Sequence, residues 1–144
     1  MNSQNPLIKK EFFGWPVAIA ADFATRQLSG CVGTRLLSET DRVRVWEIRL
    51  PPGARLGFHR HVLDYFWTAV TAGKARSYRD DGSVAEVSYF PGETRHSHYA
   101  AGEFKVHDLE NIGDTELVFS TVEFLESENL PIALPAAIRS VNNA

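Results

Sequence analysis

The sequence has little of what marks disulfide-rich, nucleic-acid-binding or membrane proteins. It holds a single cysteine, Cys31, so no disulfide can form within the chain. Its lysines and arginines are scattered and its formal net charge is -3, which argues against nucleic acid as a main partner. The apolar stretch at residues 15–21 is too short to span a bilayer and is followed by charged residues. We therefore expect a cytoplasmic protein with no membrane partner.

What the sequence does hold is a run of short strand-like segments from residue 43 to residue 125. Residues 43–50 alternate between the two faces of a strand and end at Pro51-Pro52-Gly53. A second run covers residues 57–71, and an Asp-Gly turn at 81–82 joins the next two segments as a hairpin. Many short strands closed by Gly, Pro or Asx predict an all-β fold, an antiparallel jelly-roll β-barrel with little helix.

The 144 residues and a hydrophobic fraction of 44% suit one domain with one core. We divide it into an N-terminal arm (1–40), a barrel (41–126) and a C-terminal tail (127–144). The arm carries Phe12, Phe13, Trp15 and Phe23 without clear periodicity. These aromatics are expected to pack on the barrel or on a partner subunit, and a homodimer is the expected assembly.

Five histidines stand out as the candidate chemistry, and four of them form the pairs His59-x-His61 and His96-x-His98. Residues i and i+2 of a strand point to the same face, so each pair can aim two imidazoles into one cavity. Imidazole suits divalent transition metals. One such pair alone is a weak signal. His96 and His98 either line the mouth of the same cavity or, in the plainer interpretation, are partly exposed histidines on an edge strand.

The surroundings of the first pair are more specific. Gly53, five residues and His59-x-His61 are followed by Gly73, and later by His107-x-x-x-Asn111. This pattern resembles the two sequence motifs of the cupin superfamily, and within it the small single-domain cupins, some of which act in bacterial β-alanine degradation. The resemblance implies a cupin barrel in which His59, His61 and His107 bind one divalent transition metal per subunit (Fe, Mn, Zn or Ni).

The sequence departs from the family pattern at one ligand. The position four residues after the second histidine, where the family has glutamate, holds Tyr65. By strand alternation Tyr65 shares the face of His59 and His61, which makes it a candidate catalytic residue beside the metal, or else a barrel-lining aromatic. Whether Tyr65, Asp64 or His98 replaces the missing glutamate stays open at this point.

A three-histidine metal site leaves coordination positions for a small-molecule ligand. The expected function is a metal-dependent enzyme acting on a small organic molecule, dioxygenase-like or a lyase or isomerase. The alternative is a non-catalytic cupin that binds a metal or a small ligand and is accessory to a catabolic pathway, because no clear general base lies near the motif.

Overall fold

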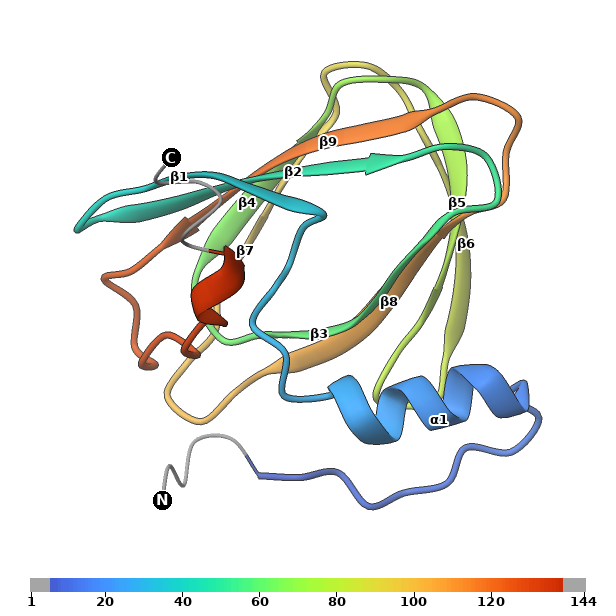
Figure 1. Ribbon diagram of the computed structural model, residues 1–144, viewed down its shortest axis with the longest axis horizontal. Helices are drawn as coiled ribbons and strands as arrows, with labels where there is room; N and C mark the ends of the chain where they lie inside the picture. Colours follow the sequence, from blue (N-terminus) through green and yellow to red (C-terminus); the bar gives the residue numbers. More distant parts are fainter. Residues whose placement is uncertain (1–5, 139–144) are drawn as a thin grey trace.

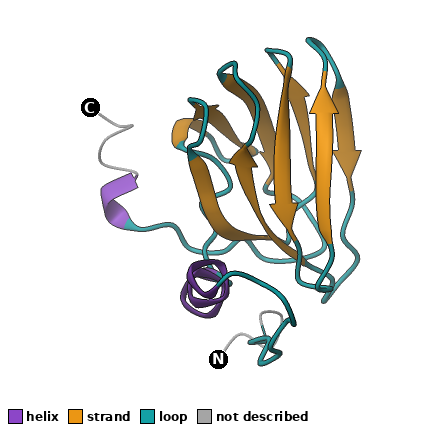
Figure 2. Cartoon of the chain, turned by 90° about the vertical axis from the view of Figure 1, so that its right-hand side faces the viewer, coloured by secondary structure: helices purple, strands orange, loops and turns teal. Residues whose placement is uncertain are grey.

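The computed structural model describes residues 6–138 and consists of two antiparallel sheets that face each other. The first sheet has the strand order β1-β2-β9-β4-β7, and the second has the order β3-β8-β5-β6. Figures 1 and 2 show the sheets curving toward each other, with one helix beneath the second sheet. The elements are α1 (Val17–Arg26), β1 (Arg35–Glu39), β2 (Val43–Leu50), β3 (Arg55–His61), β4 (Tyr65–Ala69), β5 (Gly73–Tyr78), β6 (Val84–Tyr89), β7 (Thr94–Ser97), β8 (Lys105–Asn111) and β9 (Leu117–Phe124). The predicted jelly-roll barrel with an N-terminal arm is confirmed.

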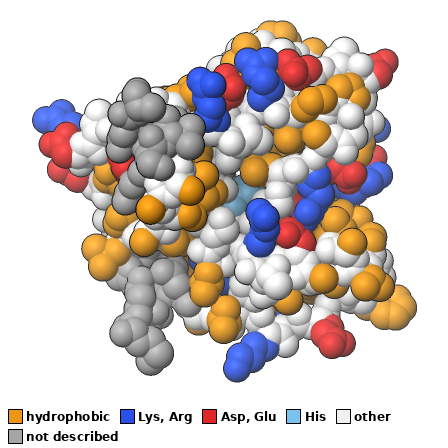
Figure 3. All heavy atoms as spheres, viewed as in Figure 1, with side chains coloured by type: hydrophobic (Ala, Val, Ile, Leu, Met, Phe, Trp, Pro, Cys, Tyr) orange, Lys and Arg blue, Asp and Glu red, His pale blue; other side chains and the backbone are white. Residues whose placement is uncertain are grey.

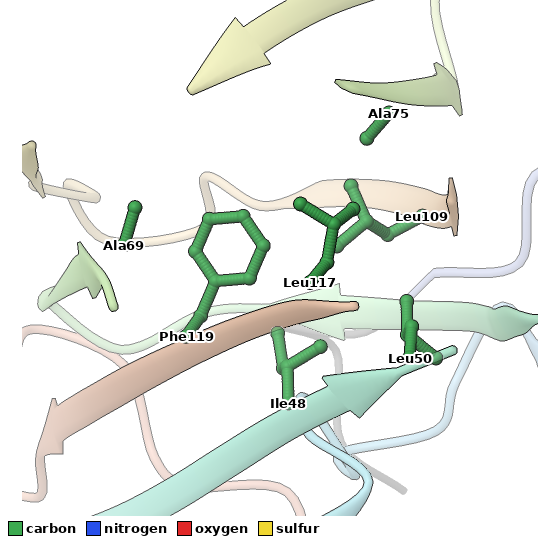
Figure 4. Close-up of a cluster of buried hydrophobic side chains, with 7 residues drawn as sticks. All are labelled: Ile48, Leu50, Ala69, Ala75, Leu109, Leu117 and Phe119. Atoms are coloured by element: carbon green, nitrogen blue, oxygen red, sulfur yellow. The ribbon is translucent and has the colours of Figure 1, made fainter. Parts of the chain in front are cut away.

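The barrel core fills one end of the space between the two sheets (Figure 4). Every contributing strand alternates, so that its apolar residues point inward. Burying each large side chain of this kind stabilises the fold by about 1.5–3 kcal/mol. The core consists of Ile48, Leu50, Ala69, Ala75, Leu109, Leu117 and Phe119.

The N-terminal arm covers the outer face of the second sheet in this chain. Trp15 stacks on Phe58 of β3 with 5.7 Å between ring centroids, and Phe23 meets the same ring edge-on at 5.1 Å. Helix α1, which carries Phe23, was not predicted; its signals are Pro16 before an alanine-rich run. Strand β1 lies within the residues assigned to the arm.

The C-terminal tail also contacts the barrel, since Leu134 is buried with Trp46 and Leu36. The last part of the predicted tail, residues 139–144, lies outside the described residues. Along residues 6–138, no helix is long and apolar enough to cross a membrane.

The expected single strand at residues 57–71 is wrong, because the chain changes sheets there. Strand β3 ends at His61 in the second sheet, and β4 begins at Tyr65 in the first. The amide of Asp64 bonds to the Ser127 hydroxyl at the crossing (2.9 Å). Both strands nevertheless direct side chains into the same interior, so the crossing keeps Tyr65 near the histidines.

Candidate metal centre

Two paired strands bring the three expected histidines together. Strands β3 and β8 run antiparallel, and His59 lies directly opposite His107 in their register. His61 follows His59 on the same face of β3. Within the described part of the chain, the only group of three or more His, Cys, Asp or Glu residues close enough to hold a metal ion is His59, His61 and His107, whose candidate ligand atoms lie within 4.8 Å of one another.

A bulge in β3 puts His59 on the interior face. Leu56 pairs with Leu109 and His59 pairs with His107, so three steps along β3 match two along β8. One extra residue in a strand reverses which side chains face inward from that point on. Leu56 and His59 therefore both point into the barrel, although they are three residues apart.

Helix α1 stabilises this bulge. The Asp22 carboxylate accepts the Phe58 backbone N–H at 2.9 Å and pairs with Arg55 at 2.9 Å. Arg55 also donates to Asp108, whose carboxylate is fully buried, at 2.7 Å. A Cβ on Gly57 would lie 3.1 Å from the same Asp22 oxygen, so the close approach of the helix favours glycine there. Sequence reasoning missed Asp22, because nothing in the sequence places it beside the histidine motif.

Hydrogen bonds to Nδ1 orient the imidazole rings of His59 and His107. His59 Nδ1 lies 2.9 Å from the Gly57 carbonyl, which can only accept, so Nδ1 carries the proton and Nε2 keeps its lone pair. His107 Nδ1 lies 3.4 Å from the Ser77 hydroxyl, which donates to the Asp108 carbonyl at 2.6 Å. His61 Nδ1 is buried and has no partner among the described residues. Outer partners of this kind orient metal-binding histidines, so His61 is the least constrained of the three.

The spacing of the nitrogens fits one ion. His61 Nε2 and His107 Nε2 are 3.0 Å apart. Two nitrogens at about 2.1 Å from one metal, at an angle of about 90°, are separated by about 3.0 Å. The donor set is imidazole alone, which suits a divalent transition metal better than calcium or magnesium.

Burial keeps all three imidazoles neutral, as ligands must be. Desolvation lowers the pKa of His59 to about 4, with the charge of Lys105 acting in the same direction. Desolvation also lowers the pKa of His61 and of His107 well below the usual range, helped by neighbouring histidines and by Lys105. The three side chains can therefore approach one another without charge repulsion.

The centre opens on a small cavity inside the barrel. It has a volume of about 50 Å³, with walls that include Trp67, Phe119 and Thr121 as well as the three histidines. Figure 3 shows histidine atoms in a hollow near the middle of the face seen in Figure 1. A space of that size holds only a few waters or a small chemical group next to the imidazoles.

Solved structures similar to this chain share its fold. A cupin domain from Bordetella pertussis Tohama I is 29% identical, with 62% of this chain and 88% of that chain covered and a TM-score of 0.54. A double-stranded β-helix protein from Klebsiella pneumoniae is 21% identical (69% and 76% covered, TM-score 0.50), and an RmlC-like cupin from Methanocaldococcus jannaschii is 19% identical (62% and 76%, TM-score 0.51). No protein-family model matches the sequence, and no curated protein matches it. The chain therefore has the cupin fold, a double-stranded β-helix.

At the position of the cupin glutamate, Tyr65 lines the cavity but lies flat against a histidine. Its ring stacks on His61 with 4.2 Å between centroids and an interplanar angle of 11°. Lys105 Nζ donates to the Tyr65 hydroxyl at 3.2 Å. Burial, together with the charge and hydrogen bonding of the Tyr65 hydroxyl, raises the pKa of Tyr99.

The other substitutes considered for that glutamate lie away from the cluster of three histidines. The Asp64 carboxylate accepts from His98 Nδ1 at 2.9 Å and from the Tyr99 N–H at 3.0 Å. The His98 side chain is 67% exposed. His96 packs its ring near Phe66, with 5.3 Å between centroids, and is exposed as well. His96 and His98 are both exposed, as the plainer interpretation holds, and His96 also lines a cavity that His107 lines.

Asn111, at the cupin asparagine position, holds the turns at the apolar end of the barrel. Its side-chain amide donates to the carbonyls of Leu50 and Thr115, and its oxygen accepts the Gly113 N–H. This buried residue therefore ties the end of β2 to the turn before β9. The finer resemblance, to the cupins of β-alanine degradation, stays a prediction.

Proposed function

We propose that this cupin is a metal-dependent enzyme that acts on a small organic molecule. The observation that carries the proposal is the convergence of three neutral imidazoles on one point beside an interior cavity. His59, His61 and His107 would hold the metal through Nε2. A divalent transition metal bound there supplies open coordination positions and polarises an oxygen atom of a ligand.

The remaining residues of the site shape the space and handle protons. The stacked Tyr65 ring closes the wall beside His61, and its hydroxyl adds a polar group to the cavity lining. Trp67 and Phe119 exclude water from the rest of the cavity. We assign Tyr65 the role of proton donor or acceptor toward a bound substrate, with Lys105 holding its oxygen in place.

The metal assignment is tested by matched histidine variants. Protein purified without a polyhistidine tag is stripped with EDTA and reloaded with Fe(II), Co(II), Ni(II) or Zn(II), and bound metal is measured by elemental analysis. We expect about one metal per chain for the wild type and for His96→Ala, and little for His107→Ala, because only His107 belongs to the converging set. Full metal content in folded His107→Ala would overturn the assignment.

Tyr65→Phe separates the proposed proton role from metal binding. This variant keeps the ring that stacks on His61 and removes only the hydroxyl. We expect unchanged metal content and a loss of stability of about 1 kcal/mol or less. Loss of metal in this variant would show that the Tyr65 oxygen is a ligand.

The reaction class is proposed as dioxygenase-like, or as a lyase or isomerase. A turnover screen with small organic acids, thiols and catechols, with Fe(II) under O₂ and with other metals under argon, separates these classes, and His107→Ala supplies the background rate. The alternative is a non-catalytic metal-binding or ligand-binding cupin, which predicts ligand binding without turnover in every arm.

The assembly and location stay predictions. We propose a homodimer, which light scattering at tens of micromolar tests directly: a species of one chain's mass would contradict it. A cytoplasmic location is likewise proposed from the sequence alone.

A further inference from the structure

A second cavity adjoins the histidine centre and is lined by cations without any carboxylate. It has a volume of about 200 Å³ and shares Trp67, Tyr89, His107 and Leu109 with the smaller cavity. Its charged lining residues are Arg79, Arg95 and Lys105, and neither aspartate nor glutamate is among its lining residues. In Figure 3, Lys or Arg side chains stand beside the hollow in which the histidine is seen.

Arg79 is the cation that most needs a partner. It follows directly after β5 and forms an isolated antiparallel bridge with His107, so it lies directly beside the centre. Its Nε atom is buried and has no hydrogen-bond partner within residues 6–138. No carboxylate of the described chain lies within 4.0 Å of the Arg79 guanidinium, whereas Arg76, three residues earlier, pairs with Glu86 and Glu110. A buried arginine donor left unpaired is costly, which favours an anionic ligand.

Lys105, the first residue of β8, adds a second positive charge to the cavity. It lies opposite His61 in the register of β3 and β8, on the face that carries His107. Among the described residues, its Nζ forms one hydrogen bond, to the Tyr65 hydroxyl, and no ion pair. Like His107, it lines this cavity, which places it near the centre.

The rest of the wall limits what the anion can be. Ala75, Ala85, Val87, Trp67 and Leu109 make much of the lining apolar. At about 30 Å³ per water, a cavity of about 200 Å³ has room for about seven water-sized groups. These dimensions suit a small organic acid whose uncharged body rests on the apolar wall.

We infer that the ligand of this cupin is a small organic carboxylate, bound by Arg79 and Lys105 beside His107. This inference deepens the proposed function and rests on it for the placement of the carboxylate next to a metal. The guanidinium offers paired N–H donors to the two carboxylate oxygens. Arg95, which is exposed and pairs with Glu93 at 3.4 Å, adds positive potential at the rim.

The test compares acids with their uncharged amides. Acetate, isobutyrate and benzoate, and the matching amides, are titrated by calorimetry into wild type, Arg79→Met and Arg76→Met, each metal-free and Co(II)-loaded. Arg76→Met is the matched control, because it removes the same charge from β5, three residues before Arg79, at a position that does not line the cavity. We expect at least one acid to bind wild type about tenfold or more tightly than its amide, and Arg79→Met to lose about tenfold in that affinity, since the lost bonds are charge-assisted. Arg76→Met should stay within about twofold of wild type.

Failure of the carboxylate site and failure of the metal centre give different results in this test. Equal acid affinity in Arg79→Met and wild type, amides that bind as well as acids, or no binding by any acid would each overturn the inference, whatever the metal content. Absence of bound Co(II) would overturn the metal centre, and the Arg79-dependent preference for acids in metal-free protein would then still support the carboxylate site. Circular dichroism checks folding first; if Arg79→Met is unfolded, Lys105→Met takes its place with the same expected loss and the same overturning results.

Discussion

The two ends of the barrel interior are built from the same strands and differ in what they contain. Strand β8 gives Leu109 to the apolar end and His107 to the other, and β9 gives Phe119 to the first and Glu123 to the second. At the apolar end every large inward side chain is matched by apolar neighbours (Figure 4). At the histidine end, His61 Nδ1 and Arg79 Nε are buried and have no hydrogen-bond partner among the described residues. The apolar end therefore supplies stability, and the histidine end can carry unsatisfied groups that a ligand would pair.

Removing volume from the apolar end should have the largest effect on stability. Leu117 is fully buried, and its Cδ2 lies 2.4 Å from the point where a Cβ on Gly73 would stand, so the packing there is tight. We expect Leu117→Ala to lower the free energy of unfolding by about 3 kcal/mol. Metal content per folded molecule should not change.

Urea denaturation measures this loss, with Leu37→Ala as the control. Leu37 is 39% exposed on β1, so its truncation should cost about 1 kcal/mol or less. Equal losses in the two variants would contradict the tight packing of the apolar end.

At the histidine end, Glu123 should make stability depend on pH. Burial raises its pKa from the ordinary 4.5 to about 7, although the Trp46 N–H bond (2.8 Å) and the charge of Arg44 oppose the shift. Between pH 4.5 and 7 the unfolded chain releases the proton while the folded chain keeps it. The stability that the protonated Glu123 carboxyl contributes is therefore fully present below pH 4.5 and is lost as the pH rises to 7. This loss amounts to up to about 3 kcal/mol.

Glu123→Gln removes that dependence while its amide oxygen still accepts from Trp46. Metal-free wild type should lose stability relative to Glu123→Gln as pH rises from 4.5 to 7, and the difference should level off above 7. Glu126→Gln, an exposed change three residues away, is the control. Parallel curves of stability against pH for wild type and Glu123→Gln would show that the Glu123 carboxyl of the folded protein does not keep its proton in this range.

Loss of Asp22 should act on both stability and metal affinity, with a smaller effect than either change above. Asp22→Ala leaves the Phe58 N–H of the bulge and one side of Arg55 without their partner. We expect a loss of about 2 kcal/mol in stability and about tenfold in metal affinity, since the bulge orients His59. Arg26→Ala removes only the exposed ion pair of the same carboxylate and should change metal affinity by less than about twofold. Similar affinities in the two variants would mean that the bulge does not position His59.

The sequence predicts the strands, the barrel and the grouping of the three histidines, because alternation and turn residues are local signals. His59, His61 and Tyr65 do face one interior, yet the chain changes sheets between His61 and Tyr65, which alternation alone does not reveal. The roles of Asp22 and Arg79 cannot be predicted from the sequence for another reason. Asp22 binds Phe58, which is 36 positions further along the chain, and Arg79 pairs with His107, which is 28 positions further along. Only the folded sheet brings these partners close.

The central claim is that one metal is held between His59, His61 and His107, and anomalous diffraction from a metal-loaded crystal tests it most directly. Data collected on both sides of the metal absorption edge locate the ion independently of the protein atoms. We expect one strong peak about 2.1 Å from the three Nε2 atoms. A peak at His96 and His98, or no peak in a fully loaded crystal between the three imidazoles, would contradict it.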